Sequence, residues 1–219
     1  MITIEDIKNS SQIRTYIQKA DETMCALGYT EHSFAHVTRV SETARQILLT
    51  LGYSPREAEL AQIAGYIHDI GNVINRVDHA QSGAVMAFRI LDNMGADPED
   101  IATIITAIGN HDEGTAFPVN AVAAAIILAD KTDVRRTRVR NRDKATFDIH
   151  DRVNYAVEKA STTLDAAGKA VVLDLQLDTG MSPVIDYFEI FLERMLLCRK
   201  AAEKLGLSFR LVVNGQTVL

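Results

Sequence analysis

The 219-residue chain contains little cysteine, with Cys25 and Cys198 far apart in the sequence. Two such thiols are too few for a disulfide scaffold or for a zinc site built from thiolates. Cys198 lies inside a helical pattern and Cys25 lies near the end of another. We therefore expect both cysteines to be small buried apolar residues.

Long apolar runs are also missing. The longest one, residues 121–129, has nine members, whereas a membrane-spanning helix needs about 18. The N-terminus is acidic and has no basic segment followed by an apolar one, so it does not resemble a signal peptide. We expect a cytoplasmic protein with no membrane partner.

Positive charge is in the minority, since the formal net charge is −6. This balance argues against a nucleic acid as partner, because such binding depends on neutralising phosphates. Residues 131–144 are an exception, because this segment is strongly basic. Its positive residues are Lys131, Arg135, Arg136, Arg138, Arg140, Arg142 and Lys144, and its negative residues are Asp133 and Asp143.

Apolar residues recur at helical spacing through the first 150 residues. With serine, proline and glycine as boundary signals, the predicted helices span about residues 11–27, 31–51, 54–71, 79–94, 97–111 and 118–133. Beyond residue 150 the apolar residues alternate instead. This alternation predicts strands at 158–164, 171–177 and 207–213, a turn at 166–169 and a helix at 182–205.

The sequence therefore predicts a mainly α protein in two parts. Residues 1–150 are expected to form a helical domain, and residues 151–219 a small α/β C-terminal unit with the order β-β-α-β.

The chain has six histidines, and any one of them taken alone is more often a surface or core-edge residue than a metal ligand. Their arrangement is informative, because several predicted helix ends carry a His or Asp directly after an apolar stretch. His68 and Asp69 end one such helix, and Asp130 follows the apolar residues 126–129. Buried aspartates need a partner, and imidazole with carboxylate suits divalent transition metals.

These residues, in this order, resemble the HD superfamily of metal-dependent phosphohydrolases. The resemblance covers about residues 31–136 and is carried by His36 in His-Val-Thr-Arg-Val, His68-Asp69-Ile70-Gly71, His79 in Asp-His-Ala-Gln-Ser-Gly-Ala, His111 in Gly-Asn-His-Asp-Glu, and Asp130 in Leu-Ala-Asp-Lys. It implies that the helical domain is an HD-type bundle. The C-terminal unit lies outside the family pattern.

The resemblance also implies the ligands of two divalent metal ions. One ion would be held by His36, His68, Asp69 and Asp130, and a second by His79 and His111, with Asp69 bridging. This set is similar to the dinuclear branch of the superfamily. Because such a shell accepts Fe, Mn, Ni, Co and Zn alike, the sequence does not choose among these metals.

The implied reaction is hydrolysis of a phosphate ester or anhydride, of a nucleotide or dinucleotide, by a metal-activated water. Asp69 and His68 are the predicted catalytic residues. The predicted substrate-binding residues are Lys131, Arg135, Arg136, Arg76 and His32, although an arginine-rich stretch is as often a solvated loop. Family members often carry Lys where this chain has Asn72, and phosphodiesterases of the family often have paired histidines where Asp112 follows His111.

Two other functions remain open at this point. A small branch of the same superfamily uses a similar ligand set in di-iron oxygenases, and a non-catalytic signalling or scaffold protein is the third possibility. The expected partner is a phosphate-containing small molecule, and a homodimer is the base-rate expectation for oligomeric state.

Overall fold

Side-chain caps begin the helices of the N-terminal part. Ser10, Ser33, Ser54, Asp97 and Asn120 each accept a hydrogen bond from a backbone N–H in the first turn. In the computed structural model, which describes residues 1–165 and 167–219, the helices that follow are α2 (Ser11–Ala26), α3 (Phe34–Thr50), α4 (Pro55–Ile67), α6 (Pro98–Gly109) and α7 (Ala121–Lys131). Helix α5 (His79–Asn93) has no side-chain cap.

Short elements that the sequence pattern did not predict join these helices. They are α1 (Ile4–Asn9), α8 (Ile149–Ala156) and the 3-10 turns η1 (Ile70–Val73), η2 (Arg136–Arg138) and η3 (Lys144–Thr146). Because η1 is separate, α4 ends at Ile67 rather than near residue 71. The expected domain boundary at residue 150 falls inside α8.

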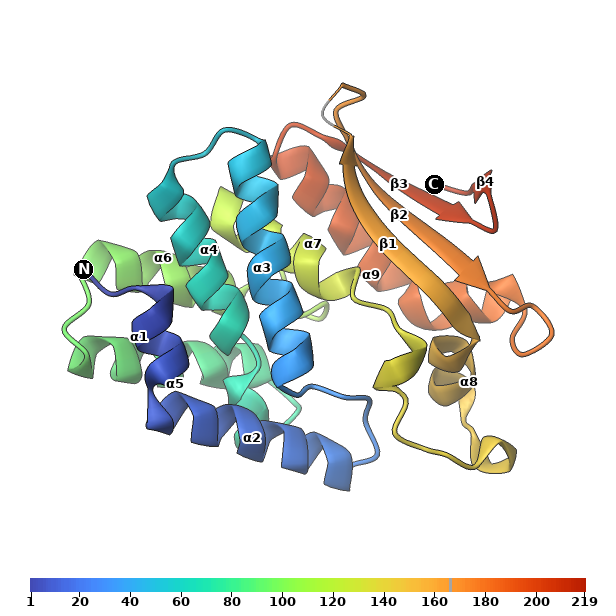
Figure 1. Cartoon of the computed structure of the whole chain (residues 1–219), viewed down its shortest axis with the longest axis horizontal. Coiled ribbons are helices and arrows are strands. Elements are labelled where there is room, and N and C mark those ends of the chain that lie inside the picture. Colours follow the sequence, from blue (N-terminus) through green and yellow to red (C-terminus); the bar gives the residue numbers. More distant parts are fainter. Residues whose placement is uncertain (166) are drawn as a thin grey trace.

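The C-terminal part contains one sheet and one long helix (Figure 1). Its elements are β1 (Val157–Asp165), β2 (Ala170–Leu177), α9 (Val184–Lys204), β3 (Ser208–Val213) and β4 (Gln216–Thr217). The strands lie in the order β1-β2-β3-β4. β1 pairs with β2 antiparallel, β2 with β3 parallel, and β3 with β4 antiparallel. The prediction of a mainly α protein with a small C-terminal β-β-α-β unit is thus confirmed, with β4 added.

Helix α9 covers one face of this sheet. Leu173 and Leu175 of β2 and Leu211 of β3 are fully buried, whereas Asp174 between them is exposed. The turn predicted at 166–169 includes Ala166, which lies outside the described residues.

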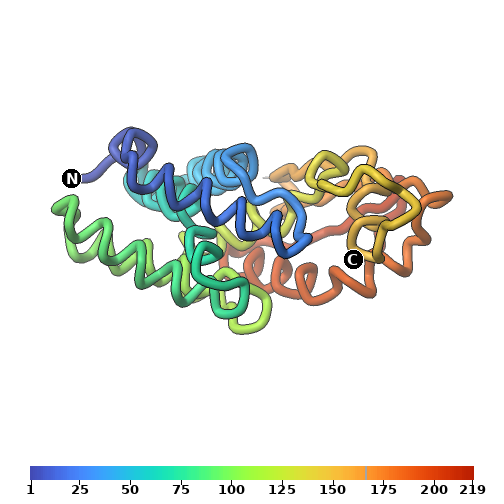
Figure 2. Tube along the Cα trace, turned by 90° about the horizontal axis from the view of Figure 1, so that it is seen from below, coloured from blue at the N-terminus to red at the C-terminus, as the bar shows by residue number. Residues whose placement is uncertain are grey.

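One continuous apolar core extends through both parts of the chain. Helix α7 is buried along nearly its whole length and packs against both α3 and α9. Figure 2, seen from below, shows the helical body and the C-terminal unit side by side along the long axis. Each part therefore shields apolar surface of the other.

The two cysteines differ in environment. Cys198 is buried as expected, and burial raises the pKa of its thiol. Cys25 is exposed, so the prediction that it is buried was wrong. It lies in the last turn of α2, where the side chain points away from the apolar stripe. Within the described residues, the helices are too short or too polar to cross a membrane.

Candidate metal centre

Helix ends from five elements meet at one point in the body. His36 lies in the first turn of α3 and His79 is the first residue of α5. His68 and Asp69 directly follow α4, His111 follows α6 by two residues, and Asp130 lies in the last turn of α7. The four histidines are almost completely buried, as is Asp69.

The histidine rings are held in place through their Nδ1 atoms. The Nδ1 atom lies 2.9 Å from the Gly65 carbonyl in His68, 3.0 Å from the Arg76 carbonyl in His79, and 2.6 Å from the Ile108 carbonyl in His111. In His36 it lies 2.8 Å from Oδ2 of Asp133. Carbonyl and carboxylate oxygens only accept hydrogen bonds, so each Nδ1 donates, and in a neutral ring each Nε2 then carries a lone pair.

These Nε2 atoms surround the carboxylate of Asp69. Its Oδ2 lies 3.2 Å from Nε2 of His68 and 3.7 Å from Nε2 of His36. Its Oδ1 lies 3.4 Å from Nε2 of His79 and 3.8 Å from Nε2 of His111. The two oxygens of one carboxylate therefore face two separate pairs of imidazoles.

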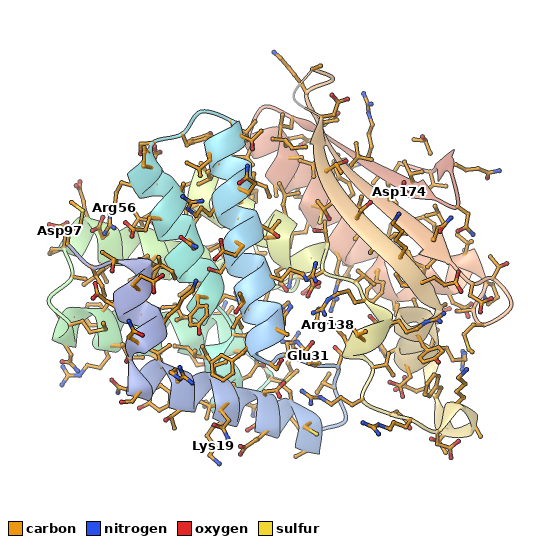
Figure 3. All side chains as sticks on the ribbon, viewed as in Figure 1. Lys19, Glu31, Arg56, Asp97, Arg138 and Asp174 are labelled. Carbon is orange, nitrogen blue, oxygen red and sulfur yellow. The ribbon has the colours of Figure 1, made fainter. Side chains whose placement is uncertain are left out.

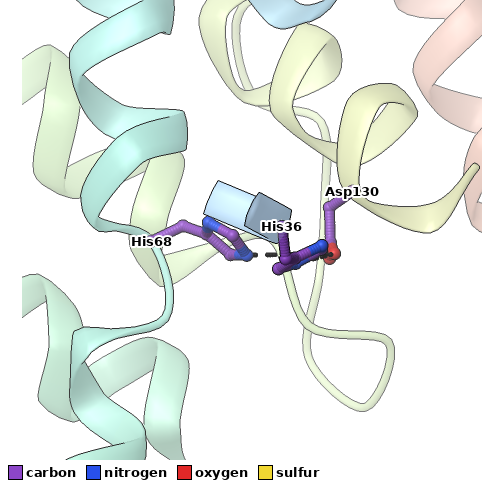
Figure 4. Close-up of side chains that lie close together, drawn as sticks. All are labelled: His36, His68 and Asp130. Atoms are coloured by element: carbon purple, nitrogen blue, oxygen red, sulfur yellow. Dashed lines mark ion pairs between the residues drawn. The ribbon is translucent and has the colours of Figure 1, made fainter. Parts of the chain in front are cut away.

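Asp130 completes the first pair. Its Oδ1 lies 3.3 Å from Nε2 of His36 and 3.8 Å from Nε2 of His68 (Figure 4). Among the residues the structure describes, these two buried Nε2 atoms have no hydrogen-bond partner. At the second pair, Nε2 of His79 lies 3.1 Å from Nε2 of His111. Lone pairs this close repel one another unless a cation or a proton lies between them.

The ionisation states of the two carboxylates and of His79 suit a cation. Burial opposes the charged form of Asp69 and Asp130, but His68 beside Asp69 and Lys131 beside Asp130 hold the pKa of each carboxyl well below its usual range. Burial lowers the pKa of His79 to about 3, so this ring is neutral at pH 7. Ionised carboxylates and neutral imidazoles are the forms that coordinate divalent metals. Two groups have ligand atoms close enough to share an ion: His36, His68 and Asp130, and His68, Asp69 and His111.

A comparison with protein families matches residues 33–156 of this chain to the HD domain. The chain belongs to the HD domain family. The match covers more than half of the chain and confirms the resemblance to the HD superfamily, while the dinuclear branch stays a prediction. It ends with α8, six residues beyond the boundary expected at residue 150.

Two similar proteins can be named. The uncharacterized protein MJ1020 of Methanocaldococcus jannaschii is 28% identical in an alignment of 182 positions, which covers 73% of this chain and 70% of that protein. The crystal structure of a predicted HD superfamily hydrolase from an uncultured Thermotogales bacterium is 26% identical. It covers 62% of this chain and 75% of that one, with a TM-score of 0.46.

Asp133 contacts a candidate metal ligand and was not among the site residues predicted from the sequence. Besides accepting the hydrogen bond from His36, it accepts from Nε and Nη2 of Arg135 at 2.7 and 3.0 Å. Burial raises the pKa of Asp133, but these hydrogen bonds outweigh it, and the net shift is downward. Its place three residues after Asp130, one turn further along the chain, was the available signal.

The structure does not bring Arg135 and Arg136 to the metal centre. Arg135 is engaged by Asp133 and by Glu31, at 3.4 Å. Arg136 donates from Nε to the carbonyl of Tyr155 at 2.5 Å, and its guanidinium lies 4.5 Å above the ring of that residue. The chain leaves α7 at Lys131 and turns through η2, and neither Arg135 nor Arg136 lines the inner cavity beside the centre.

Arg138 lies two residues after Arg136 and, unlike Arg135 and Arg136, it lines the cavity beside the centre. Its Nε donates to the carbonyl of Glu31 at 2.9 Å and its Nη1 to the carbonyl of Asp133 at 2.8 Å. Figure 3 shows Arg138 and Glu31 close together between the body and the C-terminal unit. The side chain is buried.

An inner cavity opens onto the centre, and three of the residues expected to bind substrate line it. Its wall consists of Thr30, His32, Asp69, Arg76, His79, His111, Asp130, Lys131, Arg138 and Arg194. Arg76 reaches Nε2 of His79 with its Nη1 at 3.2 Å. Lys131 is largely engaged, because its Nζ lies 2.7 Å from Oδ2 of Asp130 and 3.0 Å from Oε2 of Glu113.

Arg194 also lines the inner cavity, and the sequence did not predict it as a site residue. It belongs to α9, in the C-terminal unit for which the sequence indicated no function. No motif marks it, because its place in the wall depends on how α9 packs against α7.

Proposed function

We propose that this HD domain protein is a metal-dependent phosphohydrolase with a dinuclear centre, acting on a phosphate ester or anhydride of the nucleotide type. In this proposal His36, His68, Asp69 and Asp130 hold one divalent cation, and His79, His111 and Asp69 hold the other. The observation that carries it is the convergence of four buried Nε2 atoms on carboxylate oxygens, with every Nδ1 used as a donor.

Bound divalent cations would lower the pKa of a water molecule and neutralise charge on the reacting phosphate. The protein supplies the rest by position. Asp69 presents one oxygen to each pair of histidines. It would therefore set the distance between the two proposed cation sites and orient the water molecule that attacks the phosphate. Arg76 and Arg138 line the same cavity and stabilise negative charge on the substrate.

Metal content per chain is the first test, measured by elemental analysis on protein purified without chelator. We expect about two equivalents of a transition metal in the wild type, about one in His79→Ala, and less than one in Asp69→Ala. Asp174→Ala, on the exposed face of β2, is the matched control and keeps the wild-type content. If no metal binds even after reloading, the proposed centre is wrong.

Phosphate release from a panel of monoesters, diesters and anhydrides is the second test. We expect at least one compound to be hydrolysed, and Asp69→Ala to lose about 1,000-fold or more in kcat/KM, as expected when charge stabilisation at the reacting group is removed. A metal-loaded protein that hydrolyses none of them would contradict the proposal. Iron content together with oxygen consumption would support the di-iron oxygenase instead.

A further inference from the structure

The C-terminal unit contributes a guanidinium to the wall of the metal centre. Arg194 lies on α9, and its Nε is 2.5 Å from Oε1 of Glu113. The guanidinium lies 4.7 Å from the centre of the Phe191 ring. Within the described part of the chain, the structure gives Arg194 no further ion pair or hydrogen bond, so Nη1 and Nη2 are available to a ligand.

Arg194 stands where two cavities join. Four of the six proposed metal ligands, Asp69, His79, His111 and Asp130, line the inner cavity. An outer cavity of about 370 Å³ shares Thr30, His32, Arg76, Arg138 and Arg194 with it. The outer cavity extends between α8, α9 and the segment that joins α2 to α3, so both parts of the chain enclose it.

The two cavities differ in charge. Four cationic side chains and two carboxylates line the inner one: Arg76, Lys131, Arg138 and Arg194 with Asp69 and Asp130. The far wall of the outer cavity, on α8 and the residue before it, carries Asp148, His150, Asp151 and Asn154. A ligand in the outer cavity would have an anionic end at the junction with the inner one, against Arg76, Arg138 and Arg194, and hydrogen-bond donors such as hydroxyl or amino groups toward α8.

We infer that Arg194, with Arg76 and Arg138, binds the phosphate of the substrate, and that the substrate is a small phosphomonoester whose alcohol part carries hydroxyl or amino groups. This inference rests on the proposed function and narrows it. A terminal phosphate is close to doubly charged at pH 7, which matches several guanidiniums converging on one cavity. The outer volume lies at the lower end of small-molecule sites, which suits one sugar or nucleoside.

Binding to the metal-loaded full-length chain tests the role of Arg194, with inorganic phosphate and ribose 5-phosphate as probes in isothermal titration. A charge-assisted hydrogen bond contributes enough that Arg194→Gln is expected to weaken both affinities about 10- to 100-fold. Arg199→Gln, an exposed arginine of the same helix, leaves them unchanged. If Arg194→Gln binds both probes like the wild type, the inference is wrong.

A second variant tests the outer cavity independently of Arg194. Asp151→Asn removes a carboxylate from α8. We expect it to lower the affinity for ribose 5-phosphate severalfold and to leave the affinity for inorganic phosphate unchanged. Equal affinities of wild type and variant for ribose 5-phosphate would overturn the assignment of the alcohol part. So would a dinucleotide that binds more tightly than the corresponding mononucleotide.

The same measurements separate this inference from the proposed function. If a phosphomonoester is hydrolysed and Arg194→Gln changes neither its KM nor phosphate binding, the inference fails and the phosphohydrolase stands. If phosphate binding depends on Arg194 but no ester or anhydride is hydrolysed, the phosphohydrolase fails and the anion site stands. The melting temperature of each variant in phosphate-free buffer shows that it is folded.

Discussion

His36 differs from the other histidines of the centre because a carboxylate, and not a carbonyl, holds its ring. Asp133 Oδ2 accepts from Nδ1 of His36 while the guanidinium of Arg135 engages both Asp133 oxygens. A carboxylate behind a histidine orients the ring and strengthens its Nε2 as a ligand. The orientation of His36 is therefore tied to the segment that follows α7.

Replacing Asp133 by Asn tests this dependence. We expect Asp133→Asn to lower metal affinity about 10- to 100-fold, the usual effect of losing such a partner, because the amide holds Nδ1 less firmly. Competition with a chelator of known affinity measures the change. Asp174→Asn on the exposed face of β2 serves as the control, and an unchanged affinity in Asp133→Asn would contradict the argument.

Gly71, two residues after Asp69, is required by close packing. A Cβ at this position would clash with the carbonyl oxygen of His79 and lie 2.5 Å from the nitrogen of Gly83. Both are backbone atoms that cannot move aside, so η1 is seated directly against the start of α5.

Gly71→Ala is accordingly expected to destabilise the fold by about 3 kcal/mol or more, at the severe end of overpacking. Urea unfolding followed by circular dichroism measures the loss. Gly114→Ala provides the comparison, since a Cβ there meets open space, and it should change the free energy of unfolding by less than about 0.5 kcal/mol. Similar stabilities for the two variants would show that η1 can shift.

At the scale of the elements, α4 illustrates how local signals position a site residue. Ser54 accepts from the N–H of Glu57, and the Glu57 carboxylate accepts from the N–H of Ser54 in return. This capping box fixes the start of the helix whose other end delivers His68.

Ser54→Ala should cost about 1 kcal/mol of stability, as for other lost N-caps. Because Ser54 lies at the opposite end of α4 from His68, metal content should stay at the wild-type value. Urea unfolding and elemental analysis on the same preparation check both statements. A loss of metal without a loss of stability would mean that the cap acts on the centre in some other way.

The elements that the sequence predicted well are those with a long apolar stripe and a local boundary signal. Helices α2, α5 and α6 lie within one or two residues of the predicted ranges, because caps and glycines act on neighbouring residues. Helices α1 and α8 were missed, since six and eight residues are too short for a periodicity to be seen.

For the site, too, the sequence predicted what depends on neighbouring residues and not what depends on contacts between distant segments. The ordered histidines and aspartates could be found because several of them follow an apolar stretch at a helix end and because their order resembles the HD pattern, and the structure brings all six together. Arg135 and Arg136 were chosen for their nearness to Asp130 in sequence. Which arginine faces the cavity depends instead on the turn η2 and on Glu31, and that information is tertiary.

At the scale of the whole molecule, the proposed metal centre would join the ends of helices that are far apart in the sequence. Ions that bind the folded chain and not the unfolded chain stabilise it by mass action. The proposed ligands come from α3, α5 and α7 and from the segments after α4 and α6, so the benefit is shared by the entire body.

Removing the metal should therefore lower the melting temperature of the whole chain. A free metal concentration 100 times the dissociation constant contributes about 2.7 kcal/mol, which corresponds to about 5–10 °C for a protein of this size. Scanning calorimetry with and without chelator measures the shift. Asp69→Ala should melt at the same temperature in both conditions, and an equal chelator effect on this variant would point to a cation bound elsewhere.

Three of the four histidine rings are held by a carbonyl only three residues earlier in the chain. Their tautomer is thus set by the local turn and does not depend on a contact with a distant helix. The packing of the helices then brings together rings whose tautomer is already set locally. A mutation deep in the core can therefore alter the spacing between the donor atoms, while the identity of the donor atom in each of these rings is inherited from a few neighbouring residues.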